Sequence, residues 1–561
     1  MRSAAKFMRM KTKRDQYERV STRDSEAFTT RVSNSNSMGS SRDEESDDES
    51  WRTKDYEDAL QCAGFGRFQY ILAMICGWAN ASDAVEILSV SFILSPAQCA
   101  MGLKSSEKGV LSSIVFVGMM IGGYFWGYLA DINGRRQVLM VSLTFNAVCA
   151  IISSLCQTYW WFLLFRLLSG IGVGGSIPVV FSYVAEFMPK QHRGKMISVV
   201  AFFWMCGNIV AAALAWIVIP RDWGHRSEHF DYSSWRIFIV VCTLPSLTSA
   251  VFFALLPESP KFLIHKGEET KALQVLAMVY QINKRRARQF YPVKSILLDD
   301  YNCNRYDTIS STGPSVIHTS SNLVKRVLLD TLHKIAAVFA TTWSLFKPPL
   351  TRRTLVLVVQ MFTLSFGYYG LWLWLPTLLD DMNKNGGSAC DRPSNTSSAS
   401  DPDCNQDGSA NIDDEVYKQS FITSLSNLPG NILTIFLVDY TGRKSLLVSS
   451  MILSGVSVLF IWLVQTTTQT LIMMCIFGGI SVIGWNVLDV LQCELYPTNK
   501  RALAIGFLTL VGRIGSIIAN LAFAALIEEH CAVPILTVAV FMLFGGFLAL
   551  FLPNMQGKPL E

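Results

Sequence analysis

Apolar residues along this chain gather in blocks of about 20, the length of α-helix that crosses a hydrocarbon layer about 30 Å thick. Short polar segments separate the blocks. The pattern predicts twelve membrane-spanning helices, an even number that places both termini on the same side. The expected spans are 70–95, 108–130, 138–157, 160–186, 196–219, 236–257, 353–377, 417–438, 446–466, 469–493, 502–526 and 532–553.

The composition of the 561 residues agrees with this pattern. Half of the residues are hydrophobic, 16% are charged, and the mean hydropathy is +0.32. Globular chains carry about 25% charged residues. We therefore expect an all-α polytopic membrane protein, and we exclude soluble enzymes and nucleic-acid-binding proteins as classes.

A search for metal-binding and catalytic motifs does not change the expectation of a membrane protein. The thirteen cysteines and seven histidines form no CxxC or HExxH motif and no cluster at metal-ligand spacing. No nucleophile–base arrangement or phosphate loop stands out either. We expect no enzymatic activity, no metal and no cofactor.

Lysines and arginines predict the orientation, because cytosolic loops of membrane proteins are enriched in them. They are concentrated after spans two, four, eight and ten and in the long middle loop, which contains the run Lys284, Arg285, Arg286 and Arg288. Both termini are therefore expected in the cytosol. The predicted segments are a disordered tail (1–69), an N-terminal six-helix half (70–257), a cytosolic loop (258–352), a C-terminal half (353–553) with a lumenal loop (378–416), and a short C-terminal tail (554–561).

The predicted lumenal loop contains the sequon Asn395-Thr396-Ser397, so Asn395 is the expected glycosylation site. Cys390 and Cys404 lie on the same oxidising side. They could close a small disulfide loop or remain two free thiols, and the spacing does not decide between these alternatives.

The N-terminal tail has a basic start, a Ser/Thr/Asn stretch, and an acidic run at residues 42–50. Such a segment buries too little apolar surface to fold alone. It is either a solvated tail or a phosphorylatable arm that docks on a partner.

An internal repeat is the most informative feature of the sequence. The motif Asp131-x-x-Gly-Arg135-Arg136 after span two recurs as Asp439-x-x-Gly-Arg443-Lys444 after span eight. The motif Glu186-x-x-Pro-x-x-x-Arg193 at the end of span four recurs at the end of span ten as Glu494-x-x-Pro-x-x-x-Arg501. Both repeats have the same offset, which indicates two related six-span halves.

This arrangement resembles the major facilitator superfamily, whose halves rock about a site at the membrane midplane. The resemblance implies that the repeated motifs form cytosolic charge networks. Carboxylates and guanidiniums at helix ends would pair only while the cytosolic ends are together. We therefore expect a gate formed by Asp131, Arg135, Arg136, Glu186, Arg193, Asp439, Arg443, Glu494 and Arg501.

Ionisable residues inside the spans are costly, which makes each one a functional candidate. Asp83 and Glu86 share one face of span one, Arg166 lies in span four, and Asp489 lies in span ten. Arg513 in span eleven is a second basic residue within a span. Either these groups form a structural network, or the carboxylates of Asp83 and Glu86, with Arg166 as their basic counterpart, form a site for a cation or a coupling proton.

Aromatic residues divide into two sets by depth. Trp372 and Trp374, near the end of span seven, fit an interfacial belt. Trp204 and Trp485 lie eight or more residues inside their spans, where a belt residue does not belong.

Several segments resemble the synaptic vesicle glycoprotein 2 family, including Asn80-Ala-Ser-Asp83-Ala-Val-Glu86, Phe203-Trp204-Met205, Ser365-Phe-Gly-Tyr368-Tyr369-Gly370 and Trp485-Asn-Val-Leu-Asp489. The likeness implies a ligand pocket between the halves, lined by Ile177, Trp204, Tyr368, Tyr369, Trp485 and Asp489. Met361 replaces the tryptophan that the family has in span seven. The loop at 378–416 lacks the long lumenal repeat domain of vertebrate members.

The resemblance supports two functions. The first is a transporter-like protein of synaptic or secretory vesicles that moves a small organic, potentially cationic solute across the bilayer, with or without proton coupling. The second is a non-transporting regulator of exocytosis that binds partners, such as the calcium sensor synaptotagmin, through its tail.

Overall fold

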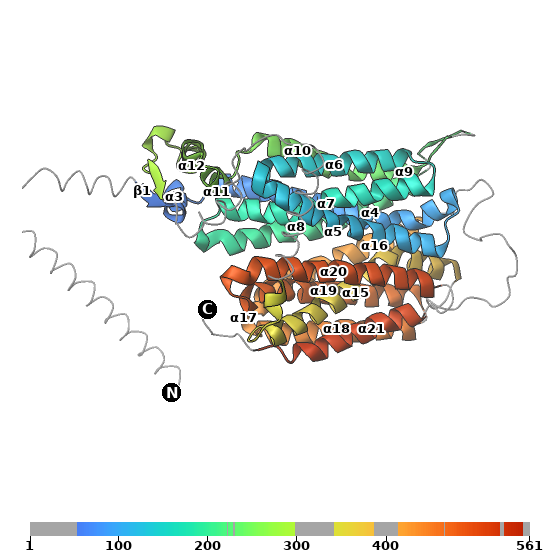
Figure 1. Ribbon diagram of the computed structural model, residues 1–561. Coiled ribbons are helices and arrows are strands. Elements are labelled where there is room, and N and C mark those ends of the chain that lie inside the picture. The colour runs from blue at the N-terminus through green and yellow to red at the C-terminus, as the bar shows by residue number, and fades with distance from the viewer. Residues whose placement is uncertain are drawn as a thin grey trace, which may run out of the picture. The chain divides into compact units, whose positions relative to one another are not determined.

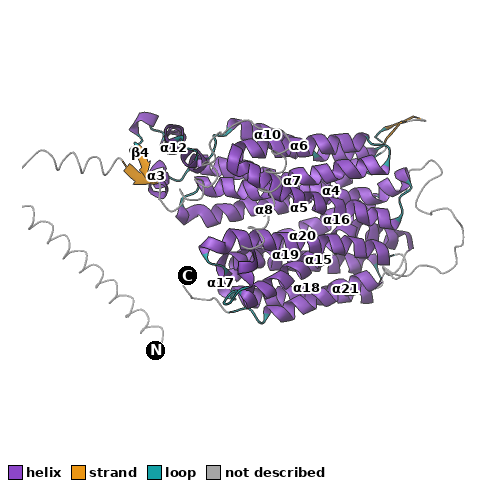
Figure 2. Cartoon of the chain, in the orientation of Figure 1, coloured by secondary structure: helices purple, strands orange, loops and turns teal. Residues whose placement is uncertain are grey.

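The computed structural model describes residues 53–221, 223–227, 230–297, 342–385, 413–464, 466–527 and 532–553. The chain divides into two units, residues 1–54 with 292–297, and residues 55–291 with 298–561. Strands β1 (Thr53–Asp55) and β4 (Ser295–Leu297) form a two-stranded sheet. Helices dominate the rest of the described chain (Figure 2).

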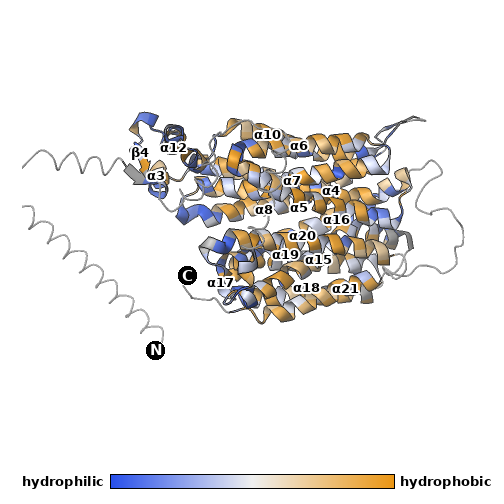
Figure 3. Ribbon diagram, viewed as in Figure 1, coloured by the Kyte–Doolittle hydropathy of each residue, from blue (hydrophilic) through white to orange (hydrophobic). Residues whose placement is uncertain are grey.

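Twelve described segments are long and apolar enough to cross a membrane, as the sequence predicts. Their outward faces carry large exposed apolar side chains, and orange runs along every long helix in Figure 3. The helices are α4 (Arg67–Met101), α5 (Ser105–Asn133), α6 (Arg135–Leu155), α7 (Tyr159–Phe187), α8 (Lys190–Val218), α9 (Ser234–Cys242) with α10 (Leu244–Leu255), α15 (Thr351–Asn385), α16 (Asp414–Leu425) with α17 (Asn427–Tyr440), α18 (Arg443–Leu463), α19 (Thr467–Leu495), α20 (Thr498–Leu526) and α21 (Ala532–Ala549).

The helices form two groups, the N-half (α4 to α10) and the C-half (α15 to α21), which lie side by side in Figure 1. Within the N-half, α5 and α7 pack very closely. A Cβ added at Gly122 would lie 2.0 Å from the carbonyl oxygen of Ile171, and one at Gly174 would lie 2.3 Å from that of Met119. The glycines of the two helices therefore permit a backbone contact that no larger residue allows.

One end of the bundle carries additional short helices, and we call it the capped end (Figure 1). These are α3 (Tyr56–Ala63), α11 (Pro260–His265) and α12 (Glu269–Lys284), followed by a 3₁₀ turn at Arg288–Phe290. A second 3₁₀ turn, Ser344–Phe346, precedes α15. The tail expected to be disordered through residue 69 thus contains a helix, because α3 buries Ala59, Leu60 and Ala63.

The opposite end of the bundle, which we call the far end, is where the two halves meet. Its hairpin of β2 (His225–Ser227) and β3 (Phe230–Tyr232) connects α8 to α9. Here Trp216 of α8 stacks on Phe421 of α16 at 5.8 Å, and Tyr417 donates a hydrogen bond to the carbonyl of Phe92 at 3.4 Å.

Further contacts between the halves extend from the far end toward the middle of the bundle. The Ser113 hydroxyl donates to the carbonyl of Ile517 at 3.3 Å, and the rings of Phe116 and Tyr369 meet edge to face at 5.1 Å. These hydrogen bonds and ring contacts hold the two halves together from the far end toward the middle of the bundle. The structure is therefore closed at the far end.

One span of the C-half is broken in its middle. Ser426 separates α16 from α17, and Pro429 follows in the first turn of α17. Proline cannot donate a backbone hydrogen bond, which explains why regular helix is interrupted here. The α16 piece packs against α8 of the N-half, whereas α17 packs mainly against α19 of its own half.

Candidate functional site

Aromatic side chains from α15 and α19 form a cluster in the middle of the C-half. The ring of Trp485 lies 6.1 Å from both Tyr368 and Tyr369, edge to face with each. Trp372 stacks on Tyr368 with ring centroids 5.5 Å apart and planes inclined by 7°. Three of the residues that the family resemblance assigns to the ligand pocket are thus in mutual contact.

The N-half faces this cluster through α7 and α8. Ile177 and Trp204 are half-buried, and both pack against the same core as the aromatic cluster. Asn208, one helical turn after Trp204, lies beside the Tyr368 hydroxyl, although the geometry falls short of a hydrogen bond. Asn208 is therefore the α8 residue placed beside the aromatic cluster, while Ile177 and Trp204 are placed in the large core that the two halves share.

Three polar atoms in this region are buried without a hydrogen-bond partner among the described residues. They are Oδ1 of Asn208, Oη of Tyr368 and Nε1 of Trp485. An unsatisfied buried polar group costs about 1–3 kcal/mol. The arrangement therefore offers one acceptor, one hydroxyl and one donor to a polar ligand or to water.

Asp489 lies on α19 one turn beyond Trp485 and six residues before the helix ends at Leu495, and it is exposed. Its charge acts on Tyr369, which faces the N-half, and on Cys493, which is also exposed one turn nearer the capped end. Within the described chain Asp489 makes no ion pair or hydrogen bond. A carboxylate in this position is available to a cationic group.

The two acids of α4 have different partners. The Glu86 carboxylate accepts from Arg166 Nη1 at 2.8 Å and from the Ser169 hydroxyl at 2.7 Å, and all three side chains are buried. Ser169 also contacts Asn146 Oδ1 at 2.7 Å, and Asn146 Nδ2 donates onward to Ser246. This network ties α4, α6, α7 and α10 together inside the N-half.

Asp83 belongs to a separate arrangement. The Ser176 hydroxyl lies 2.8 and 2.7 Å from its two carboxylate oxygens, so it can donate to either one. Arg513 of α20 acts electrostatically on the Asp83 carboxylate of the other half and on Tyr369, and it lies 5.7 Å from the Phe116 ring. Asp83 is thus the acid that connects electrostatically across the two halves.

Trp372 and Trp374 are not belt residues, which corrects the prediction from their position in the span. Trp374 is 0% exposed, donates to Asn520 Oδ1 at 3.2 Å, and has the Lys108 ammonium 5.9 Å from its ring. Because the neighbours of Trp374 come from both halves, its ring is packed between the halves at the far end and does not lie at the membrane–water interface. Met361, the departure from the family pattern, is buried beside Gln492.

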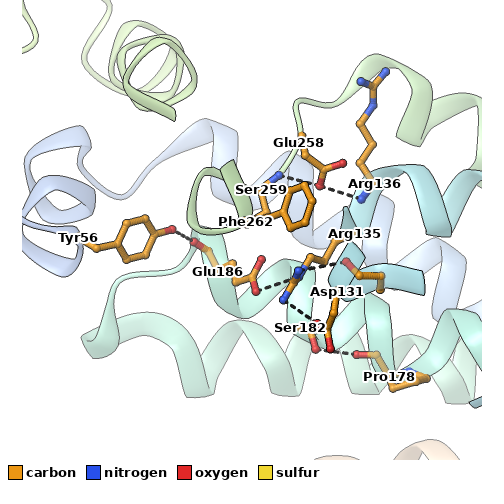
Figure 4. A network of polar contacts seen from close by, with 11 residues as sticks. Tyr56, Asp131, Arg135, Arg136, Pro178, Ser182, Glu186, Glu258, Ser259 and Phe262 are labelled. Carbon is orange, nitrogen blue, oxygen red and sulfur yellow. Dashed lines mark hydrogen bonds and ion pairs between the residues drawn. The ribbon is translucent and has the colours of Figure 1, made fainter. Parts of the chain in front are cut away.

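The motif residues of the N-half form a charge network at the capped end (Figure 4). Arg135 pairs with Asp131 and with Glu186, each at 3.2 Å, and lies over the Phe262 ring at 5.4 Å. Arg136 donates its backbone N–H to Glu258 at 3.0 Å, and its guanidinium donates to backbone carbonyls at the end of α10.

The C-half contains a smaller version of this network. Arg443 pairs with Glu494 at 2.7 Å, and Arg501 Nε has no hydrogen-bond partner in the part of the chain described. Asp439 lies in α17, but its side chain lies outside the described part. These pairs each join helices of one half. That the motifs act as a gate stays a prediction.

Three predicted positions of the far-end loop, Asn395, Cys390 and Cys404, lie outside the described residues. Cys99, near the end of α4, is disulfide-bonded, which the sequence reasoning did not anticipate. Its position at the end of a span on the predicted oxidising side was the available signal.

Other residues of the site were not singled out from the sequence. Ser176, Asn208 and Phe116 are small, polar or aromatic residues within apolar spans, and nothing in their spacing distinguishes them from structural ones. Arg513, by contrast, is singled out by the sequence as a basic residue within span eleven, but its partners come from distant helices.

Two family models match the chain. The model described as "Sugar (and other) transporter" matches residues 27–294, and the "Major Facilitator Superfamily" model matches residues 419–560. Together they cover the N-half and most of the C-half, and α15 lies between the two matched ranges.

Curated relatives match nearly the whole chain. Synaptic vesicle glycoprotein 2C of Rattus norvegicus is 31% identical over 605 aligned residues, covering 91% of this chain and 82% of the relative. Synaptic vesicle glycoprotein 2B of Mus musculus is 32% identical, with coverage of 92% and 88%. The chain belongs to the synaptic vesicle glycoprotein 2 family. The family that the sequence resembles is therefore confirmed.

Solved structures support the fold of this family member. The xylose transporter XylE from E. coli in a partially occluded inward-open conformation has a TM-score of 0.63 at 16% identity, covering 88% of this chain and 99% of the transporter. The inward-open conformation of the same transporter gives a TM-score of 0.59 at 15% identity. The chain therefore has the major-facilitator fold, and it is a multi-pass membrane protein of transporter-like architecture.

Proposed function

We propose that this protein is a transporter of synaptic or secretory vesicle membranes that moves a small organic cation by alternating access. The vesicle location follows from the names of its relatives, synaptic vesicle glycoproteins 2A, 2B and 2C. The capped end is the cytosolic side in this proposal, and both termini lie there.

The observation that carries the proposal is the unpaired carboxylate of Asp489. It is exposed in the last two turns of α19, one helical turn after Trp485 and within electrostatic reach of Tyr369. A cation beside an aromatic face and a carboxylate gains about 1–2 kcal/mol or more from the ring alone when desolvated. Ile177, Trp204 and Tyr368 complete the binding site, with the buried polar atoms of Asn208 and Trp485 for a hydroxyl or amide of the solute.

Within this proposal, Asp83 is the coupling acid, and Glu86 with Arg166 holds the N-half rigid. Arg513 compensates Asp83 from the opposite half in the state described. When the halves rearrange, a proton can replace Arg513 as the compensating charge. In this proposal the repeated motifs at the capped end keep each half rigid during the movement and act as a gate between the cytosolic ends of the two halves.

An uptake and binding screen of radiolabelled organic cations in proteoliposomes tests the proposal. Asp489→Asn should reduce cation binding at least ten-fold, a loss of about 1.4 kcal/mol. Glu415→Gln is the matched control, because it removes one far-end surface charge, paired with Lys418, without touching the site. Equal binding by all three proteins would contradict a cation site at Asp489.

The coupling assignment has its own test. Asp83→Asn should abolish uptake driven by a pH gradient, while exchange of solute at equal pH on both sides should survive. Gradient-driven uptake that persists in this variant would exclude Asp83 as the coupling acid.

A second candidate is a regulator of exocytosis that binds synaptotagmin through the acidic run at residues 42–50. It is favoured by the close attachment of the segment that follows this run, from Tyr56 onward, to gate-motif residues of the N-half. Pull-down of synaptotagmin by full-length protein, lost when residues 43–49 are neutralised, would support it.

Glycosylation at Asn395 also remains part of the proposal, and a mobility shift with glycosidase checks it.

A further inference from the structure

The segment Tyr56–Gln69, which we call the collar, wraps the connection between α7 and α8. Tyr56 donates its hydroxyl to the carbonyl oxygen of Glu186 at 2.5 Å, as Figure 4 shows. Glu57 pairs with Arg193 at 2.7 Å. The collar thus engages both charged residues of the N-half Glu-x-x-Pro-x-x-x-Arg motif.

Ring and amide contacts extend this attachment along the collar. Phe65 stacks on His192 with centroids 4.2 Å apart and planes inclined by 21°. Phe68 packs against Phe187 at 5.4 Å, and Gln69 Nε2 donates to the Phe187 carbonyl at 3.5 Å. The α7–α8 connection therefore has partners in the collar from one end to the other.

The other side of the collar is held by α12 and the turn that follows it. Asn283 donates to the carbonyl of Gly64 at 2.7 Å and accepts from the backbone N–H of Phe68 at 3.0 Å. Tyr291 donates to the carbonyl of Ala59 at 2.7 Å. The collar is consequently fixed between α12 and the two site-bearing helices.

The chemistry of the collar residues suits a permanent contact. Burial raises the pKa of Tyr56 well above its ordinary value, and the nearby carboxylates of Glu186 and Glu57 act in the same direction. The hydroxyl therefore remains a donor at every physiological pH. Glu57 supplies the charge that Arg193 would otherwise lack, since Glu186 is engaged by Arg135.

We propose that Tyr56 and Glu57 are positioning residues for the solute site, because the collar sets the relative placement of α7 and α8. Those helices carry Ile177, Trp204 and Asn208, the N-half wall of the site. This inference rests on the proposed function, because the solute site belongs to that proposal. The placement of α7 and α8 can nevertheless be measured without any solute. It gives the cytosolic tail, which continues directly into the collar, a mechanical connection to the site.

The test uses the full-length protein in neutral-lipid nanodiscs and compares Tyr56→Phe and Glu57→Gln with wild type. Hydrogen exchange should accelerate several-fold in residues 186–206 and remain unchanged in α5 and α6. Cys206, half-buried two residues after Trp204, should react several-fold faster with a maleimide, with the melting temperature essentially unchanged. These readouts report on α8 whether or not the protein transports anything.

Two further variants keep the result decisive. Glu268→Gln, which removes an exposed pair with Lys271 on the same cap, is the matched control and should change neither readout. The exchange Glu57→Arg with Arg193→Glu should restore both readouts toward wild type. Unchanged exchange and labelling in Glu57→Gln, or acceleration spread evenly through the N-half, would overturn the positioning role.

Discussion

The two halves use their charges in opposite ways. The N-half buries Glu86 and Arg166 as a hydrogen-bonded pair, whereas the C-half leaves Asp489 unpaired beside an aromatic cluster. A buried pair costs desolvation on both sides and loses most when one partner is removed. The comparison teaches that two related halves of one fold can differ in function: the N-half uses its buried ion pair for stability, and the C-half leaves the carboxylate of the proposed cation site unpaired.

The largest effect should come from breaking the buried pair. Arg166→Met leaves Glu86 uncompensated and should lower the free energy of unfolding by about 3–5 kcal/mol. The matched C-half variant, Arg443→Met, breaks a partly exposed pair with Glu494 and should cost about 1 kcal/mol or less. Thermal unfolding followed by size-exclusion chromatography measures both, and equal losses would erase the contrast between the halves.

A second prediction addresses the contact between the two halves at the far end. Trp374→Ala removes a fully buried ring and should cost about 3–5 kcal/mol, loosening the far-end contact around Lys108. Trp160, 74% exposed on the outside of α7, is the control, and its replacement by alanine should change stability by about 0.5 kcal/mol or less. Hydrogen exchange in the first turns of α5 locates the change, which should appear only in the Trp374 variant.

A third prediction concerns the aromatic side of the proposed cation site in the C-half. Trp485→Ala should weaken binding of an organic cation about five-fold, from loss of about 1 kcal/mol of ring contact. Unfolding should change much less than in Arg166→Met, because Trp485 is only half-buried. Isothermal titration with the best cation from the uptake screen gives the affinity, and undiminished binding would place the site elsewhere.

The smallest effect is a pH dependence of the cap. Burial lowers the pKa of His265, and the charges of Lys261 and Arg135 act in the same direction. The folded cap therefore binds fewer protons than the unfolded chain, so its stability falls as pH drops through about 6.5. Exchange rates of α11 and α12, corrected for intrinsic rates, should rise at low pH in wild type and less in His265→Gln.

The sequence predicted the fold almost completely, because hydrophobic blocks and the duplicated motifs depend on local pattern alone. It also identified Glu86, Arg166 and Asp489 as unusual, since a charge within an apolar block is visible without coordinates. It could not assign their partners. Whether Arg166 pairs with Glu86 or with Asp83 depends on how α4 and α7 are rotated, and no periodicity reports that rotation.

The position of a side chain relative to the membrane surface was predicted less well than the helices themselves. Trp374 lies near the end of an apolar block, which suggested an interface, yet α15 continues to Asn385 and places the ring inside the far-end contact. The collar was missed for a related reason. Its short helix has a polar sequence, and its stability comes from α12, more than 200 residues away in the chain.

The break at Ser426 has a mechanical consequence for how the protein could change shape. An unbroken helix transmits bending from one end to the other, but a helix interrupted at a proline can hinge. The α16 piece contacts α8 of the N-half, through the Trp216–Phe421 stack among others, as well as α15 and α19 of its own half, while α17 packs mainly against α19. A hinge at Ser426 would therefore let α16 keep its contact with the N-half while α17 moves with the rest of the C-half.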